Sequence, residues 1–196
     1  MFRCSVSVAL AYLLAMLAPQ AFCGPPKPAA QPLLADLAGH EVHPLEEPGI
    51  RHNVFFFIRT DRPIANRYAP EIARLHAEFA GSGVAFRLVY PGTAETASSI
   101  ARHLADYRLP RKALRDPHHL FAEKSQAKVT PEAAIFGANG ALLYHGRIDD
   151  RYVDFGQSRP EATRHDFKEA LGLALAGKPV APPSAPAVNC LIEADE

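Results

Sequence analysis

The residues with the clearest chemical meaning lie between Thr60 and Pro70, where the apolar run 54–58 gives way to helical spacing. A strand-to-helix turn of this kind activates a thiol, because the partial positive charge of the helix N-terminus stabilises thiolate. Here the turn carries Arg62 and Pro63 and no cysteine. A guanidinium stays protonated and has no lone pair to offer, so Arg62 cannot be a nucleophile. The turn therefore has the setting for redox chemistry without the sulfur.

The hydrophobic patterns around this turn predict an α/β domain. We expect strands at 54–58 and 84–90, helices at 64–79 and 94–107, a short helical turn from Asp116 to Phe121, strands at 133–136 and 141–144, and a helix at 160–176. Asp61 is the expected N-cap of the first helix, Pro63 fits its first turn, and Pro70 is expected to kink it. The order is β-α-β-α-β-β-α, a central mixed sheet with helices on both faces.

Composition limits the partners and the number of domains. The chain of 196 residues suits one domain with extensions. Its 21 Lys and Arg residues balance 21 Asp and Glu residues, which argues against nucleic acid or an anionic membrane as a partner.

Residues 1–23 are predicted to be a signal peptide, because Arg3 precedes an apolar run at 6–17 that is too short to span a bilayer comfortably. The protein is then exported, periplasmic or secreted, with no membrane span after cleavage. A lipid anchor on Cys23 is the alternative, although Phe22 is bulky for such a site.

The remaining chain divides into a Pro/Ala-rich linker at 24–48, a domain at 49–177 and a flexible tail at 178–196. Two of the three cysteines, Cys4 and Cys23, lie in the signal peptide, so the mature protein keeps Cys190. A single thiol builds no intramolecular disulfide. Because Cys190 is the thirteenth residue after Gly177, the tail could stretch roughly 40 Å, so its length does not exclude Cys190 from the groove.

Four motifs carry a family resemblance. They are Asn66–Glu71 (NRYAPE), Thr130–Glu132 (TPE), Tyr144–Tyr152 (YHGRIDDRY) and Asn189–Ile192 (NCLI). With them, residues 50–177 resemble exported redoxins, thioredoxin-fold relatives of the thiol-specific antioxidant and alkyl hydroperoxide reductase group. The resemblance implies a thioredoxin-like fold, thiol–disulfide or peroxide redox chemistry and no cofactor. It also implies that Thr130 precedes a cis Pro131 lying against the turn and shaping a groove for a partner's backbone; an ordinary trans proline is the alternative.

The chain departs from this family at the decisive position. Arg62 replaces the cysteine that would attack a disulfide or peroxide, and Asn189 replaces the glycine before Cys190. The resemblance implies that the terminal cysteine could resolve the product of that attack. Here the attacking role is vacant.

Three hypotheses follow. In the first, Cys190 carries out residual thiol chemistry, although it lacks a helix N-terminus to activate it and could equally be passive or bonded to a partner. In the second, the domain is a degenerate redoxin whose groove beside Pro131 binds a protein or peptide without turnover. In the third, Arg62 and the helix N-terminus hold a carboxylate or phosphate; the alternative is that Arg62 points to water.

Other polar groups have structural explanations. The nine histidines include His40, His43 and the pair at 118–119, but no cysteine or carboxylate completes a metal set at ligand spacing, so no metal is expected. Asp149 and Asp150, with Arg147 and Arg151, are expected to form local salt bridges rather than an acid–base pair or cation site. We expect Asp116 to cap the short helix, and Tyr68 and Tyr144 to be core or groove-wall residues.

Overall fold

The computed structural model describes residues 34–154, 156–188 and 190–192. The expected signal peptide at 1–23, with Cys4 and Cys23, lies outside these residues, as does Asn189. Among the residues described, no helix combines the length and apolar character needed to cross a membrane.

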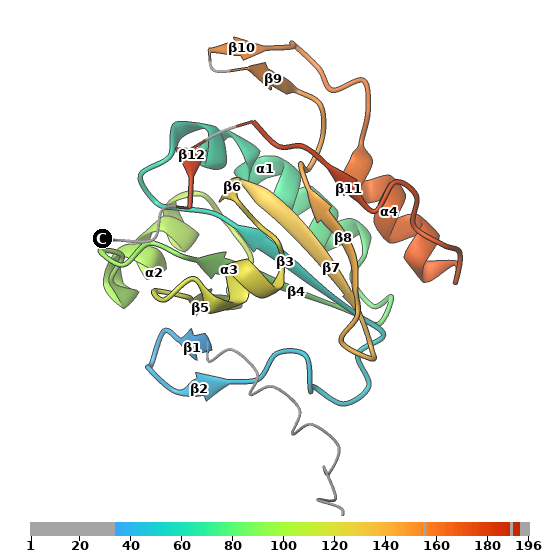
Figure 1. Ribbon diagram of the computed structural model, residues 1–196. Helices are drawn as coiled ribbons and strands as arrows, with labels where there is room; N and C mark the ends of the chain where they lie inside the picture. The colour runs from blue at the N-terminus through green and yellow to red at the C-terminus, as the bar shows by residue number, and fades with distance from the viewer. Residues whose placement is uncertain (1–33, 155, 189, 193–196) are drawn as a thin grey trace, which may run out of the picture. The chain divides into compact units, whose positions relative to one another are not determined.

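A mixed sheet forms the centre of the domain (Figure 1). Its strands are β1 (Leu34–Asp36), β2 (Glu41–Val42), β3 (His52–Phe57), β4 (Val84–Tyr90), β5 (Ala113–Arg115), β7 (Glu132–Gly137), β8 (Leu142–Gly146) and β11 (Ser184–Ala185). They lie side by side in the order β11-β8-β7-β3-β4-β5-β1-β2. Two short ribbons add β6 (Val129–Thr130) paired with β12 (Cys190–Leu191), and β9 (Tyr152–Asp154) paired with β10 (Gln157–Ser158).

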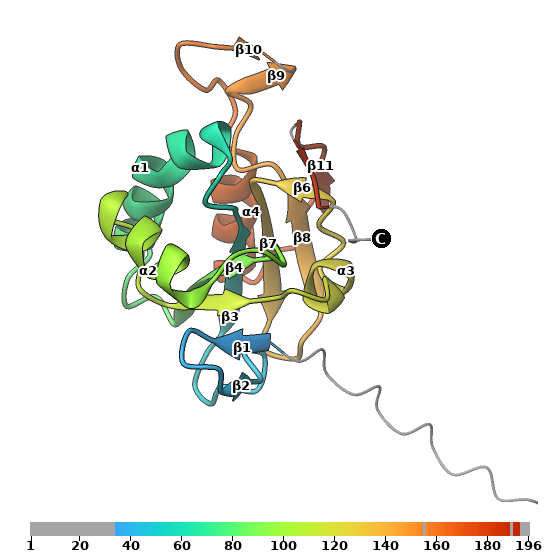
Figure 2. The same cartoon turned by 90° about the vertical axis from the view of Figure 1, so that its left-hand side faces the viewer.

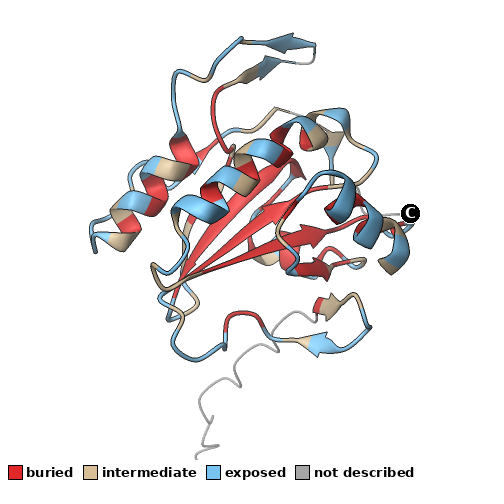
Figure 3. Cartoon of the chain, turned by 180° about the vertical axis from the view of Figure 1, so that it is seen from behind, coloured by how far each residue is buried: buried red, intermediate tan, exposed pale blue. Residues whose placement is uncertain are grey.

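Helices cover both faces of this sheet, as expected. They are α1 (Pro63–Glu78), α2 (Ala97–Asp106), α3 (Leu120–Lys124) and α4 (Asp166–Leu175). Side chains of β3 alternate between two cores: Val54 and Phe56 pack with buried residues of α1, α2 and α4, whereas Phe55 and Phe57 pack with α3. Figure 3 shows these central strands buried beneath α1, α2 and α4. An apolar run covered on both faces explains why β3 contains no polar side chain between Val54 and Phe57.

The predicted mixed sheet is confirmed. β3 and β4 are parallel and joined by α1, and β7 and β8 form an antiparallel hairpin. The first helix differs in its details. Arg62, not Asp61, occupies the N-cap position, because the Asp61 carboxylate accepts instead from Arg59 Nε at 3.2 Å. Pro63 is in the first turn as expected, and α1 continues through Pro70 to Glu78.

Two further expectations need correction. The helix predicted at 94–107 is shorter, because α2 begins at Ala97 and ends before Tyr107, which is 40% exposed. The last helix begins at Asp166, six residues after the predicted start. The segment before it is held as a loop, because the backbone N–H groups of Thr163 and Arg164 donate to the Asp150 carboxylate instead of starting a helix.

The segments expected to be linker and tail are partly built into the fold. β1, inside the expected linker at 24–48, pairs with β2 and β5, and Leu34 is buried in the core. In the expected flexible tail, β11 pairs in parallel with β8. A close approach makes this pairing possible: a Cβ on Gly146 would lie 2.0 Å from the Ala185 carbonyl oxygen. The tail is therefore docked on the domain at this point.

Candidate functional site

Strand register brings the turn at Arg62 and the proline at 131 to the same end of the sheet. The last residue of β3, Phe57, pairs with Glu132 at the start of β7. The loop entering α1 and the Thr130–Pro131 segment therefore leave adjacent strands at one end, where Figure 2 also places β6. The Thr130–Pro131 peptide bond is cis, as the resemblance implied.

Arg62 stands at the start of α1 with few interactions of its side chain. It precedes Pro63, which has no N–H, and no side chain caps the helix. The guanidinium faces the Asp61 carboxylate at 3.6 Å, and Arg62 Nε is buried without a hydrogen-bond partner. The first turn of α1 thus keeps N–H groups with no side-chain acceptor, beside a fixed positive charge.

Glu95 lies directly behind this turn, and the sequence analysis missed it. Glu95 is 5% exposed, and its Oε1 accepts a hydrogen bond from the Thr60 N–H at 2.6 Å. The other oxygen, Oε2, is buried without a hydrogen-bond partner. Burial raises the pKa of the Glu95 carboxyl, and the hydrogen bond from Thr60 partly opposes that shift. The only sequence signal was an acidic residue in the loop between β4 and α2.

A chain of polar groups, from the half-buried Asn66 to the buried His103 and Tyr90, holds the same turn from the α1 side. Asn66 Nδ2 donates to the Thr60 carbonyl at 3.3 Å, and Asn66 Oδ1 lies 2.8 Å from His103 Nε2. His103 Nδ1 in turn lies 2.9 Å from the Tyr90 hydroxyl. Burial lowers the pKa of His103 and so favours its neutral imidazole, while the charge of Asp106 opposes that shift. This network and Glu95 fix the backbone of the turn from both sides.

The tail brings Cys190 to the residue before the cis proline. In the antiparallel pair of β12 and β6, Cys190 lies opposite Thr130 and Leu191 opposite Val129. The Ile192 N–H extends this pairing with a 2.8 Å hydrogen bond to the Lys128 carbonyl. Cys190 is a free, half-buried thiol.

Taken together, this end of the sheet offers the Cys190 thiol, the fixed positive charge of Arg62 and the buried carboxyl group of Glu95. A thiol at Cys190 can exchange with a disulfide of a partner, but a second thiol that would complete an intramolecular cycle is missing from the residues the structure describes. Arg62 with the open helix N-terminus can attract an anion.

The aspartates at 149 and 150 take structural roles, as predicted. Asp149 accepts the Tyr68 hydroxyl at 2.5 Å and faces Arg151 at 3.9 Å. Asp150 pairs with Arg159 at 2.5 Å. Arg147 differs from the expectation, since it pairs with Asp166 of α4 at 2.7 Å. Tyr68 and Tyr144 are both buried in the core.

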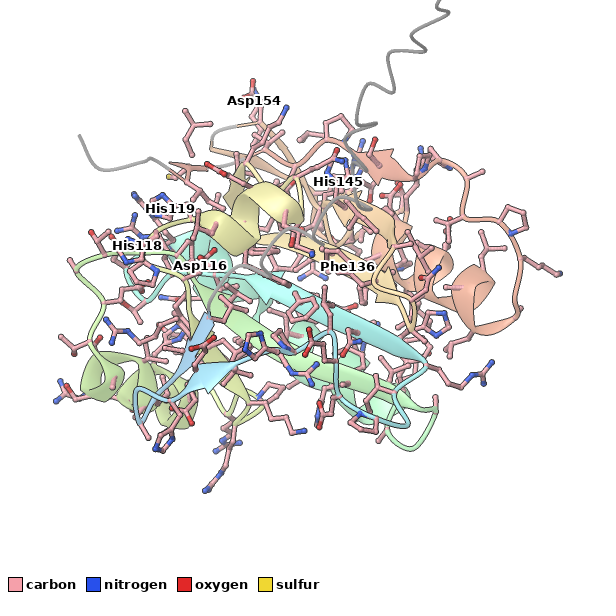
Figure 4. All side chains as sticks on the ribbon, turned by 60° about the horizontal axis from the view of Figure 1, so that its bottom comes forward. Asp116, His118, His119, Phe136, His145 and Asp154 are labelled. Atoms are coloured by element: carbon pink, nitrogen blue, oxygen red, sulfur yellow. The ribbon has the colours of Figure 1, made fainter. Side chains whose placement is uncertain are left out.

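Asp116 caps α3, as predicted. Its carboxylate accepts the N–H groups of Phe121 and Ala122 at 3.3 and 2.8 Å. His118 and His119 lie close to it in Figure 4. His119 Nε2 is 2.6 Å from the Pro91 carbonyl, so this imidazole also has a structural partner.

One set of potential metal ligands occurs in the described part of the chain. Single donor atoms of Glu71, Asp149 and His165 lie within 4.8 Å of one another. Both oxygens of Glu71, however, accept from Arg74 at 2.6 and 2.8 Å. With Arg151 facing Asp149, the carboxylate charges already have guanidinium partners, and we assign this set no metal.

A cavity of about 570 Å³ lies under the β1–β2 hairpin, near β4 and β5. Its buried cation, Arg87, donates to Asn53 Oδ1 at 2.7 Å and pairs with Glu47. None of the predicted site residues lines this cavity. We therefore place the candidate site at the Pro131 end of the sheet and not here.

No family model and no curated protein matches the chain, but solved structures do. A hypothetical protein from Sinorhizobium meliloti is 24% identical, with a TM-score of 0.70 over 82% of this chain and 88% of that one. A secreted disulfide oxidoreductase of Mycobacterium tuberculosis is 16% identical, with a TM-score of 0.51 over 75% and 96%. A thioredoxin-like protein from Aeropyrum pernix is 14% identical, with a TM-score of 0.53 over 74% and 88%. The chain therefore has an α/β thioredoxin-like fold.

Proposed function

We propose that this protein is an exported redoxin of the thiol–disulfide or peroxide class that no longer carries out thiol attack at position 62. The observation that carries the proposal is the combination at one end of the sheet. Arg62 takes the N-cap position of α1, while the cis Pro131 and the Cys190 thiol lie at the same end of the sheet. The motif resemblance and the fold shared with a secreted disulfide oxidoreductase support the class.

One remaining thiol limits the chemistry. The Cys190 thiolate can attack one sulfur of a partner's disulfide, forming a mixed disulfide and releasing the partner's other sulfur as a thiolate. A second thiolate must then attack Sγ of Cys190 in this mixed disulfide. That attack forms a new disulfide on Cys190 and releases the partner's sulfur as a thiolate. Because the described residues supply no second thiol, an external one has to complete the exchange, and turnover by the protein alone is lost.

The second candidate function is binding of a protein or peptide without turnover. The pairing of β12 with β6 supports it, because the edge beside Pro131 already holds an antiparallel strand of this chain. An anion is the smaller ligand to consider, since α1 has no capping side chain and Arg62 Nε has no hydrogen-bond partner. Loss of phosphate affinity in Arg62→Ala, measured by calorimetry, would support anion binding; unchanged affinity would exclude it.

The decisive experiment compares disulfide-reductase and peroxidase rates of the mature protein with those of Arg62→Cys and its matched control Arg62→Ser. We expect the wild type and Arg62→Ser to be inactive and Arg62→Cys to gain activity. We also expect the new thiol to form an intramolecular disulfide with Cys190, detected by mass spectrometry and absent when Cys190→Ser is added.

Two results would contradict the proposal. Robust wild-type activity abolished by Cys190→Ser would make Cys190 the working nucleophile. An Arg62→Cys variant with neither activity nor the new disulfide would mean that more than the attacking sulfur is missing. Export is tested separately: N-terminal sequencing of the protein expressed from its full chain should find Gly24 as the first residue.

A further inference from the structure

We propose that β12 is an exchangeable strand: in the resting protein it covers the edge of β6, and an extended segment of a partner protein replaces it there. The inference rests on the proposed function in one respect, the groove beside Pro131. It adds what fills that groove, how it opens and which peptide chemistry it selects.

β12 is held only weakly on β6. β12 pairs with β6 through two residues, with one further hydrogen bond from the Ile192 N–H to the Lys128 carbonyl. Leu191 remains 60% exposed, so it buries little apolar surface. A ladder this short, with so little burial, is marginally stable in water.

β6, by contrast, is held in place without β12. The Glu132 carboxylate accepts the backbone N–H groups of Lys128 and Val129 at 2.6 and 3.1 Å. Glu132 is itself buried at the start of β7. The edge therefore keeps its extended backbone when β12 leaves, which spares a partner strand the entropy of ordering it.

The tail can release β12 without detaching from the domain. Upstream, β11 remains anchored to β8, and the Arg147 N–H donates to the Ala185 carbonyl at 3.0 Å. A cavity of about 310 Å³ lies between this anchor and β6, lined by Lys128, His145, Pro186 and Leu191 among others. His145, labelled in Figure 4, brings an imidazole to this cavity from β8. The cavity gives a longer partner segment room for a side chain.

The register of β12 indicates what the partner segment looks like. The position opposite Thr130 holds the small, half-buried Cys190. The next residue, Leu191, lines the same cavity but is 60% exposed, and Ile192 packs against the core cluster around Phe55 and Phe121. We therefore assign the site to an extended segment with a small residue, then any residue, then an aliphatic residue, as in Ser-Leu-Ile.

The test uses a fluorescent peptide containing Ser-Leu-Ile, in which serine avoids disulfide formation, and measures anisotropy with the full chain. Ile192→Pro removes the N–H donated to Lys128 and the packed aliphatic side chain, so the edge opens. We expect it to bind the peptide about tenfold more tightly than the wild type, since one hydrogen bond and its packing are worth about 1.4 kcal/mol. The control Leu191→Ser, at the exposed position, should bind as the wild type does.

A second variant closes the edge covalently. Thr130→Cys places a thiol opposite Cys190, at a spacing that antiparallel pairs allow to form a disulfide. Oxidation should abolish peptide binding and reduction should restore it. Equal binding by the wild type and Ile192→Pro, or by the oxidised and reduced forms of Thr130→Cys, would overturn the inference. Peptide exchange together with an inactive Arg62→Cys variant would retain this inference and contradict only the proposed function, because more than the attacking sulfur would then be missing from the site.

Discussion

Among the polar side chains of the loop between β8 and α4, we expect the Asp150 carboxylate to contribute most to the free energy of unfolding. Its side chain is 5% exposed and accepts the backbone N–H groups of Thr163 and Arg164 at 2.7 and 2.9 Å. It also accepts the Thr163 hydroxyl at 2.6 Å and pairs with Arg159 at 2.5 Å. A hydrogen bond to a charged acceptor contributes about 1.5–3 kcal/mol to the free energy of unfolding. Where the donor is exposed, a hydrogen bond to water replaces part of that contribution when the acceptor is removed.

We therefore expect Asp150→Ala to lower the free energy of unfolding by about 3 kcal/mol, and Asp150→Asn, which keeps one acceptor oxygen, by about half of that. Urea unfolding followed by circular dichroism measures both values. Asp61→Asn is the matched control, because Asp61 is an exposed acid with surface ion pairs and should change stability by less than about 0.5 kcal/mol.

The pH dependence of the unfolding free energy tests the role of Asp150 independently. Burial acts to raise the pKa of Asp150, but the hydrogen bonds from Thr163 and Arg164 and the charge of Arg159 outweigh it and hold that pKa well below its usual range. A lowered folded-state pKa stabilises the fold above the unfolded pKa of about 3.9 and loses this effect as the pH falls further. The difference in unfolding free energy between the wild type and Asp150→Asn should therefore narrow progressively as the pH falls below about 5. A loss below about 1 kcal/mol in Asp150→Ala, or a gap that does not change with pH, would refute this account.

Three further predictions use the same unfolding assay. Tyr68→Phe removes the 2.5 Å hydrogen bond to Asp149 and should cost about 1–2 kcal/mol; an unchanged midpoint would contradict it. Glu95→Gln keeps an acceptor for the Thr60 N–H and removes a buried charge. Because burial raises the folded-state pKa of Glu95, the wild type should lose stability as the pH rises from about 4.3 toward that pKa, and the variant should not; parallel pH profiles would count against this. Gly146→Ala would push a Cβ to 2.0 Å from the Ala185 oxygen, so proteolysis should release the tail faster than in the wild type.

The elements that could be predicted from the sequence are those whose structure is decided by a long local pattern. The apolar run that became β3 and the helical spacing of α1 each bury a continuous stripe, so local periodicity was enough to place them. The cis bond before Pro131 followed from a motif whose position in the element order had already been established.

Elements whose structure is decided by pairing between distant segments could not be predicted from the sequence. β1, β11 and β12 have two or three residues each and lie in segments whose prolines suggested linkers. Their stability comes from partners far along the chain, which no local pattern reveals. Glu95 was missed for a similar reason: its importance comes from burial against Thr60, thirty-five positions away.

The side chain at position 62 contributes little to the structure that surrounds it, which makes the Arg62→Cys experiment interpretable. The turn is fixed by Glu95 on Thr60 and by Asn66 with His103, and Arg62 joins this framework through its backbone carbonyl, which accepts the Asn66 N–H at 3.0 Å. Its guanidinium adds an ion pair with the exposed Asp61. Arg62→Cys should therefore keep the wild-type free energy of unfolding within about 0.5 kcal/mol. Given that stability, any failure to gain activity would have to come from the chemistry of the site and could not be attributed to a damaged fold.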